Sequence, residues 1–589
     1  MISGRGLLAP ASVAFVFGNV AAVAARVVRA QSHYDVTPAR HDQTHLDRLN
    51  LGIWSIPVVI IAGMYGVFLL DALTRYPTGW DGLHYHLPVA VGWARTGNMN
   101  LINGLLHQSF PENGMIVPSL LLAGGLERPL TIVHLPKAVL LAAVIYGLAR
   151  AAGAGLRGSA ASVLITLSVP MVVYQSFSSY VDLYAAASWL SSLLALTWMS
   201  RVATERQRLG LLLLSGLSAG VALGSKTTFL VLVPILMGVV YAAERTGLLA
   251  RRGPRRPLYT AVIFGAATSA CSGFWFVRGT VQAGNPVYPL AVEVGGHRLL
   301  DGFTSEGLLP KRSMGSRILR WWDYPWCETK HSGTGYPYST GNGVGAAYAT
   351  FVPLALFATL IAGLRASAKS PARKWQVIFT ALALGGPVLL VTIFSGMLRF
   401  VFPLLLVGIP ATAGLIDRLA VRAERTTLSL LTAALALTAT VTALLPAKDF
   451  LGRLASGTWQ RAQLYDLPAL IDRLEPGTRV LNLASPVATY PLLGKDLSNR
   501  VIAPTEWKLK VGESISEETL REYAIDYVYV RQPWPEYWPE NLPVEKIYDD
   551  SASPQLATSS ATRIYRVLEA RDGPTGQDGR MQTVRSTAR

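Results

Sequence analysis

The chain is a succession of long apolar runs separated by short basic connections. The runs are built from Leu, Ala, Val, Ile and Gly and fill most of the chain as far as Leu445. A helix needs about 20 apolar residues to cross a bilayer, so these runs predict about eleven membrane-spanning helices. The expected spans are Ile53–Leu73, Ile132–Leu148, Ser159–Phe177, Leu183–Met199, Leu209–Leu223, Thr228–Ala243, Tyr259–Val277, Ala346–Leu364, Trp375–Phe394, Phe400–Ile416 and Leu428–Leu445.

Two other apolar stretches are ambiguous. Leu7–Val28, in the N-terminal segment 1–50, contains Asn19 and Arg26 and is followed by a polar stretch, so it is either a twelfth span or an interfacial helix. Met115–Leu126 is too short to cross a bilayer, and we expect an interfacial or re-entrant helix there.

Basic residues lie on alternate connections between the spans. If the segment before Ile53 is cytoplasmic, the clusters near Arg150, Arg206, Arg251, Lys369 and Arg422 all fall on the cytoplasmic side. The intervening connections are short and nearly free of positive charge: Ser178–Val181, Gly224–Thr227 and Ser395–Arg399. Cytoplasmic connections are enriched in Lys and Arg, so this alternation predicts the orientation of the whole bundle.

The orientation divides the chain into domains. We expect a transmembrane domain at 51–446, with external loops at 74–131 and 278–345, then an external α/β domain at 447–570 and a disordered tail at 571–589. Within the external domain, Arg479–Ala484 and Asp526–Val530 have the pattern of strands, and Glu517–Tyr523 has the pattern of a helix.

Composition supports the membrane assignment. Of the 589 residues, 51% are hydrophobic and only 15% are charged, against about 25% charged in soluble domains. A net charge of +17 would suggest nucleic acid as the partner of a soluble protein. Here the basic residues flank apolar runs, where they bind anionic lipid headgroups. We therefore expect membrane lipids and no nucleic acid as partners.

The first external loop concentrates residues that can do chemistry. It carries an acid, Asp81, and two imidazoles, His84 and His86, among several aromatic residues. Such a cluster can bind a sugar by stacking and hydrogen bonds. The alternatives are that the aromatic residues form an interfacial belt and that Asp81 caps a short helix. The residues alone leave these interpretations open.

The first external loop contains the motif Asp81-Gly82-Leu83-His84-Tyr85-His86-Leu87-Pro88. It resembles the Asp-x-x-x-Tyr-His-x-Pro pattern in the first external loop of the GT-C glycosyltransferases, the multispan enzymes that include bacterial relatives of protein O-mannosyltransferases and lipid A aminoarabinose transferases. The matches that follow are Phe110-Pro111-Glu112-Asn113-Gly114, Ser179-Tyr180-Val181-Asp182, Gly220-Val221-Ala222-Leu223-Gly224-Ser225-Lys226, Gly284-Asn285-Pro286-Val287-Tyr288-Pro289 and Leu398-Arg399-Phe400-Val401-Phe402-Pro403.

The resemblance implies a fold, a reaction and a location. It implies an all-α polytopic membrane protein of the GT-C type with a small C-terminal α/β extracytoplasmic domain, in the inner (plasma) membrane. The implied reaction moves a sugar from a polyprenyl-phosphate donor to a glycan, lipid or protein acceptor of the cell envelope, with inversion of the anomeric centre. No cofactor is certain.

The resemblance also implies roles for individual residues. Asp81 is the candidate base for the acceptor hydroxyl. Lys226, Arg399 and Arg278 are the candidate cations for the donor phosphate, since each lies where a span meets the outside and charge is costly there. The candidate contacts to substrate are His84, Tyr85, His86, Asp182, Asn285 and Tyr288. The protein O-mannosyltransferases have Glu after the loop aspartate, whereas this chain has Gly82, so a second carboxylate must come from elsewhere or is not used.

Alternatives remain for residues and for function. Lys226, Arg399 and Arg278 can snorkel to headgroups, and Asp182 can cap a helix. A divalent metal bound by His84 and His86 would need further ligands such as Asp81, Glu112 or Asp182. At the level of the whole protein, the alternatives are a transporter or flippase of lipid-linked sugars, which should show inverted repeats and broken helices, and a non-catalytic glycan-binding relative, to which Gly82 points.

The orientation makes a prediction that can be tested without knowing the substrate. A reporter enzyme that is active only in the cytoplasm, fused after Val567, should be inactive, because one span follows the last basic cluster. A reporter active only outside the cytoplasm should work at the same fusion point. The opposite pair of results would reverse the orientation and every site assignment that depends on it.

Overall fold

The computed structural model describes residues 51–99, 109–249, 256–295, 297–302, 343–365, 370–393, 398–457, 461, 465, 467–483, 489–502, 516–531, 542–549 and 562–568. The N-terminal stretch Leu7–Val28 and the tail from residue 571 lie outside these residues, so the expectations for them stay predictions. The chain divides into two compact units, a helical one that ends before residue 461 and a smaller one that follows it.

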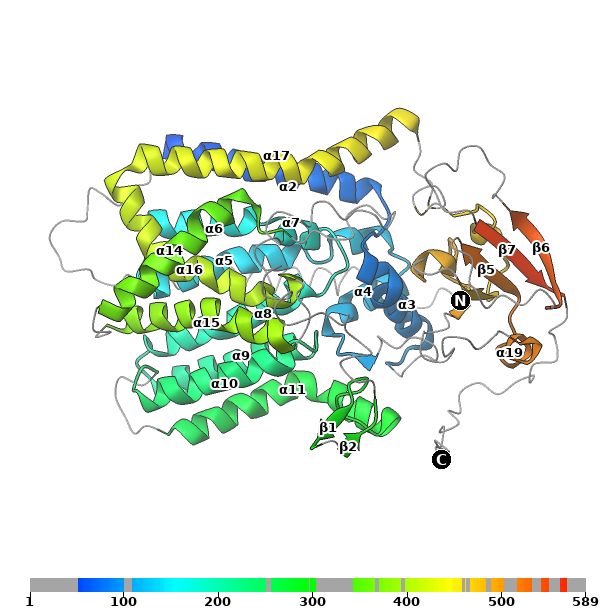
Figure 1. Cartoon of the computed structure of the whole chain (residues 1–589), viewed down its shortest axis with the longest axis horizontal. Helices are drawn as coiled ribbons and strands as arrows, with labels where there is room; N and C mark the ends of the chain where they lie inside the picture. The colour runs from blue at the N-terminus through cyan, green and yellow to red at the C-terminus, as the bar shows by residue number, and fades with distance from the viewer. Residues whose placement is uncertain are drawn as a thin grey trace. The chain divides into compact units, whose positions relative to one another are not determined.

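The helical unit contains long helices that run side by side (Figure 1). Short helical elements lie in the chain between α2 and α5, and a two-stranded ribbon follows α11. The elements are α2 Leu51–Thr74, η1 Gly82–His86, α3 Leu87–Thr96, η3 Asn113–Met115, α4 Ile116–Ala123, η4 Arg128–Ile132, α5 Leu135–Ala151, α6 Leu156–Ser168, α7 Pro170–Ser176, α8 Asp182–Met199, α9 Glu205–Leu223, α10 Phe229–Arg245, α11 Pro257–Ala283, β1 Val292–Val294, β2 His297–Leu300, α14 Gly345–Arg365, α15 Pro371–Ile393, α16 Leu398–Arg422 and α17 Glu424–Ser456.

Each of the eleven apolar runs coincides with helix in the structure, but the number of spans is not confirmed. Among the described residues, five helical segments are long and apolar enough to cross a membrane: α2, η4 with α5, α11, α16 and α17. The α6–α7 pair would make a sixth if it counts as one span. The structure therefore supports a multi-pass membrane protein, and the count of eleven stays a prediction.

The run that we expected to form one span at Ser159–Phe177 is broken. Helices α6 and α7 meet at an angle of 63° around Val169. The cause is Pro170, which has no N–H to continue the helix and pushes the preceding residue out of helical geometry. Val169 accordingly has φ −59° and ψ 118°. The apolar pattern alone does not show this break, but Pro170 inside the run is a sequence signal for it.

Helix α8 lies at the centre of the helical unit. It packs against α5, α9 and α16, and nearly all of its residues are buried, including Trp189 and Leu190 at 0% exposure. Close packing against α11 in turn depends on glycines of α9, because a Cβ at Gly220 would lie 2.2 Å from the carbonyl oxygen of Thr268. These contacts fix the outer ends of α8 and α9, which carry two of the predicted site residues.

The second unit contains a mixed sheet. Its strand order is β4-β3-β5-β7-β6, with β3 parallel to both neighbours and β7 antiparallel to β5 and β6. Leu481, Leu520 and Val528 belong to its hydrophobic core. Strands and helix lie where the sequence pattern places them. The elements are η6 Ile471–Arg473, β3 Arg479–Asn482, η7 Tyr490–Leu493, β4 Arg500–Ile502, α19 Glu517–Glu522, β5 Tyr527–Arg531, β6 Val544–Asp549 and β7 Thr562–Val567.

Helix α17 continues past the predicted end of its span at Leu445 and packs along α2. A buried charge network joins the two helices: Asp71, with 0% exposure, pairs with Arg75 of the following loop at 2.5 Å and with Arg453 of α17. Arg75 also donates to the hydroxyl of Thr78 and, at 2.8 Å, to the carbonyl of Phe177. One buried carboxylate thus compensates two arginines and anchors the start of the first external loop.

This network predicts a large cost for removing the carboxylate of Asp71. Asp71→Asn should lower the free energy of unfolding by about 3–5 kcal/mol, because it removes the buried charge that pairs with both guanidinium groups. Glu205→Gln is the matched control: Glu205 pairs with Arg208 but its side chain is 77% exposed, so the change should cost less than about 1 kcal/mol. Thermal unfolding in detergent measures both, and equal shifts would contradict the account.

Candidate active site at the outer ends of the helices

The first external loop approaches the segment before α8 closely at two glycines. Gly79 has φ +102°, and a Cβ there would lie 2.6 Å from the ring of Tyr180, so this position requires glycine. A Cβ on Gly82 would lie 3.3 Å from the Cβ of Ser179, a tight contact that a small shift of Ser179 would relieve.

A π-turn sets the directions of the side chains that follow Asp81. Element η1 has the wider turn of a π-helix, in which the N–H of Leu87 bonds the carbonyl of Gly82. With 3.6 residues per turn, an α-helix would point residue 86 about 140° away from residue 81. The wider i→i+5 turn instead brings Tyr85 and His86 to the same side as Asp81. Such turns occur often at functional sites.

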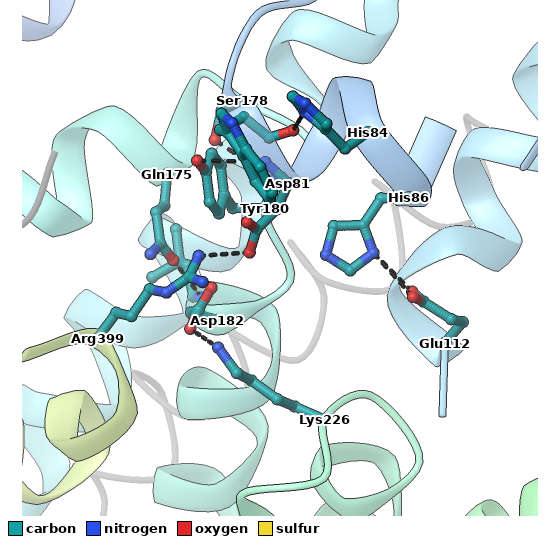
Figure 2. Close-up of polar contacts among 12 residues, drawn as sticks. Asp81, His84, His86, Glu112, Gln175, Ser178, Tyr180, Asp182, Lys226 and Arg399 are labelled. Atoms are coloured by element: carbon teal, nitrogen blue, oxygen red, sulfur yellow. Dashed lines mark hydrogen bonds and ion pairs between the residues drawn. The ribbon is translucent and has the colours of Figure 1, made fainter. Parts of the chain in front are cut away.

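Asp81 forms a buried ion pair with Arg399, the second residue of α16 (Figure 2). The hydroxyl of Tyr85 also bonds the carboxylate, and the backbone N–H of Asp81 donates to the Tyr180 hydroxyl at 3.4 Å. Burial alone would raise the pKa of Asp81, but the nearby cations, Arg399 first among them, hold this pKa well below its usual range. The carboxylate makes no helix-capping bond, contrary to the capping alternative.

A second ion pair lies beside the first. Lys226, in the turn between α9 and α10, pairs with Asp182, the first residue of α8 (Figure 2). The side chains of Lys226 and Arg399 are 14% and 16% exposed, and those of Asp182 and Asp81 are 3% and 5% exposed. Both cations are paired with carboxylates, which is not the extended geometry that snorkelling requires.

Asn113 fixes the turn that carries Lys226. Its backbone N–H donates to the carbonyl of Gly224 at 2.7 Å, and its side-chain amide donates to the carbonyl of Cys271 at 3.0 Å. The indole of Trp275 donates to the Asn113 side-chain oxygen at 2.8 Å. A Cβ on Gly224 would collide with this amide at 2.2 Å. The segment around Asn113, the α9–α10 turn and helix α11 are remote in sequence, and these contacts hold them in place against one another.

The two ion pairs together form a nearly neutral cluster that still has polar atoms free to bind a ligand. The charges of Asp81 and Arg399 act on Lys226 as well, so the four groups form one electrostatic unit. Two of its buried polar atoms, Oδ2 of Asp182 and Nε of Arg399, have no hydrogen-bond partner among the residues that the structure describes. Buried polar groups are nearly always satisfied, and exceptions call for an explanation such as a ligand.

His86 and Glu112 form a third pair at the edge of this cluster. Nδ1 of His86 lies 2.9 Å from both carboxylate oxygens of Glu112. The side chains are 4% and 1% exposed. Burial raises the pKa of Glu112, while the charges of His86 and Arg278 oppose the rise. From the sequence, Glu112 was only one potential metal ligand, because nothing in a one-dimensional pattern joins positions 86 and 112.

Several predicted site residues lie outside the charge cluster and form hydrogen bonds with backbone groups of the protein. Arg278 donates to the carbonyls of Met99 and Phe110 and stacks over Trp275. Asn285 is fully buried, and its side chain bonds the backbone at Leu290, Asp301 and Val287. It therefore shapes the loop after α11.

His84 and Tyr288 are also placed by their own surroundings. His84 stacks on Trp80 at 3.8 Å between ring centroids and bonds the Trp80 carbonyl at 2.7 Å. Tyr288 is half-buried in the loop after α11, where burial raises its pKa. His84 and His86 diverge because they lie on a π-turn and not on an extended segment. In the part of the chain that the structure describes, no three His, Cys, Asp or Glu side chains are grouped to hold a metal.

Comparison with known proteins gives a match in structure only. No protein-family model and no curated protein sequence matches the chain. Among solved structures, ArnT from Cupriavidus metallidurans in the apo state aligns with a TM-score of 0.55 and 15% identity, over 87% of this chain and 98% of that chain. ArnT bound to undecaprenyl phosphate aligns with the same TM-score and identity over 89% and 100% of the two chains. ArnT is a lipid A aminoarabinose transferase and a GT-C glycosyltransferase.

The chain has the GT-C fold.

A weaker likeness extends to the arabinofuranosyltransferase AftD from Mycobacteria, with a TM-score of 0.47 and 16% identity over 91% of this chain and 41% of that one. This value is too low to support an argument. Because the identity to ArnT is only 15%, the shared fold does not show that this chain uses the same substrate as ArnT. The function must be argued from the buried charges.

Proposed function

We propose that the chain is a membrane glycosyltransferase that moves a sugar from a polyprenyl-phosphate donor to an acceptor hydroxyl on the outer face of the membrane. The observation that carries this proposal is the pair of buried, adjacent ion pairs Asp81–Arg399 and Asp182–Lys226. They lie at helix ends that we assign to the outer face, in line with the orientation predicted from the basic connections. The bound undecaprenyl phosphate of ArnT gives independent support, since its fold is shared.

The two cations suit a lipid phosphate. A polyprenyl-phosphate sugar carries one negative charge, and its phosphate gains a second when the sugar departs. Arg399 offers a planar fork of donors and Lys226 a compact ammonium, and both lie in a dry site where electrostatic stabilisation is strong. The unpartnered Nε of Arg399 gives that residue a donor to spare for the phosphate.

Asp81 suits the acceptor hydroxyl. Its lowered pKa keeps it ionised at neutral pH, which is the state that accepts a hydrogen bond from the attacking hydroxyl. Burial and the neighbouring carboxylate raise the pKa of Tyr85 well above its usual value, so the phenol stays protonated and holds one carboxylate oxygen in place. When the phosphate engages Arg399, the guanidinium's hold on Asp81 weakens and the carboxylate becomes more basic. Attack from the face opposite the phosphate inverts the anomeric centre.

The break between α6 and α7 favours one alternative. Broken helices line the substrate path of many transporters, and a bend of 63° at Val169 is such a feature. A flippase of lipid-linked sugars would use the same cations but would move the intact lipid across the membrane. Detection of transferred sugar separates the two, because a flippase returns the donor unchanged.

The phosphate role predicts a selective loss of donor use. Lys226→Ala and Arg399→Ala should each weaken donor binding by about 1.5–3 kcal/mol, the contribution of a charge-assisted hydrogen bond. Arg399→Lys should recover part of the loss, since an ammonium cannot reproduce the bidentate fork. The control is Arg298→Ala, which removes an exposed arginine paired with Glu293. Normal donor turnover in both alanine variants would overturn the role.

The base role predicts the largest single effect. Asp81→Asn should reduce sugar transfer about a hundredfold or more, while membrane insertion and donor binding persist. Asparagine keeps the size of the side chain, so a structural role predicts a small effect. Asp472→Asn in the second unit is the matched control, because it removes another carboxylate paired with an arginine, Arg461. Transfer of radiolabelled sugar from polyprenyl phosphate in membranes measures both, and parental turnover by Asp81→Asn would exclude it as the base.

A further inference from the structure

We propose that His86 and Glu112 form the proton-accepting pair of the transfer step, with Nε2 of His86 as the atom on which the proton of the acceptor hydroxyl ends. This inference rests on the proposed function and deepens it. It assigns a chemical role to a buried pair that the charge cluster for the donor phosphate does not need.

The geometry of the pair defines which nitrogen can accept a proton. An ionised carboxylate only accepts hydrogen bonds, and Nδ1 of His86 faces both oxygens of Glu112 at 2.9 Å. Nδ1 therefore carries the hydrogen, and in the neutral ring the lone pair lies on Nε2. Glu112 orients the ring and supplies the negative charge that stabilises an imidazolium.

The position of the pair connects it to Asp81. The π-turn brings His86 to the side of Asp81, and Figure 2 shows its second ring nitrogen directed toward that carboxylate. The two groups are close enough for a positive charge on His86, once it is protonated, to act on Asp81. The rings of Tyr85 and His86 lie 4.3 Å apart, so the phenol that holds Asp81 also supports the imidazole.

Asp81 needs a group to which it can pass the proton. Even when the phosphate weakens the hold of Arg399 on Asp81, a carboxyl group is a stronger acid than an imidazolium, so protonated Asp81 releases its proton to a nearby imidazole. His86 and His84 both lie on the turn that follows Asp81, but His84 is stacked on Trp80. His86 has a buried carboxylate partner, Glu112, that compensates the new positive charge.

The charges balance through the step. The acceptor O–H bond breaks, its proton passes by way of Asp81 to Nε2, and an N–H bond forms. The acceptor oxygen bonds the anomeric carbon as the bond between this carbon and the phosphate oxygen breaks, and the phosphate keeps the electron pair. The His86–Glu112 pair changes from one net negative charge to none while the phosphate gains one, so the total charge of the buried site stays constant.

Chemical rescue tests the proposal. His86→Gly should reduce sugar transfer from a radiolabelled polyprenyl-phosphate sugar a hundredfold or more while binding of undecaprenyl phosphate persists. Added imidazole should restore at least a tenth of the rate, and substituted imidazoles should rescue in the order of their basicity. A purely structural role predicts no dependence on the basicity of the rescuing base. His297→Gly, at an exposed position of β2, is the control that should keep the parental rate.

A second variant keeps the test decisive if His86→Gly does not fold. Glu112→Gln preserves the size of the side chain and one accepting oxygen for Nδ1, and removes only the charge. The proposal predicts at least a tenfold loss of turnover with an unchanged donor KM, whereas an orienting role alone predicts the parental rate.

The outcomes separate the two proposals. If the wild type transfers sugar but Glu112→Gln turns over normally, or folded His86→Gly is not rescued, the proton-accepting pair is wrong and the proposed function stands. If the wild type transfers sugar from no polyprenyl-phosphate donor, the proposed function itself fails.

Discussion

Charges buried at the edge of an apolar helix bundle must be compensated, and this constraint organises the end of the helical unit that carries Asp81 and Asp182. Removing one partner of a buried ion pair leaves an uncompensated charge that costs several kcal/mol. Asp81–Arg399 joins the first external loop to α16, and Asp182–Lys226 joins α8 to the α9–α10 turn. Four segments that are distant in sequence are therefore tied together by the same side chains that we assign to chemistry. Stability and activity depend on one cluster.

The cluster is possible because backbones approach one another unusually closely around it. Gly79 and Gly82 lie against Tyr180 and Ser179, and Gly224 lies against Asn113. A side chain at any of these positions would push a charged segment away from its partner. The glycines of the motifs thus affect the site by allowing the charged segments to come close together. They let Asp81 reach Arg399 and let the turn with Lys226 reach the start of α8.

The sequence predicted the parts of this arrangement that follow from local pattern. Apolar runs locate the helices. The alternation of basic connections predicts that Lys226, Arg399 and Asp81 lie on the same side of the bundle, and in the structure they lie together. The pattern could not supply what depends on packing. The buried state of Asn285 depends on backbone groups that meet only in the folded loop. The bend at Val169 differs, because Pro170 is a local signal for it inside the apolar run.

Directions of side chains were the least predictable feature. On an extended segment His84 and His86 would face the same way, and with further ligands they would suit a metal. The π-turn separates them, so that His84 stacks on Trp80 and His86 bonds Glu112. Gly82, the first residue of this turn, lies close to Ser179, a tertiary contact with no signature in the sequence. The proton-accepting pair follows from this one local widening of the helix.

The central claim is that the paired cations form the binding site of a lipid phosphate. The most direct measurement is an experimental structure of the full chain in a lipid nanodisc with undecaprenyl phosphate bound. The account predicts phosphate oxygens within hydrogen-bond distance of both Lys226 and Arg399, with Asp81 partly released from the guanidinium and His86 still bonded to Glu112. A lipid phosphate bound elsewhere, for example beside Arg278, with both ion pairs unchanged, would contradict it.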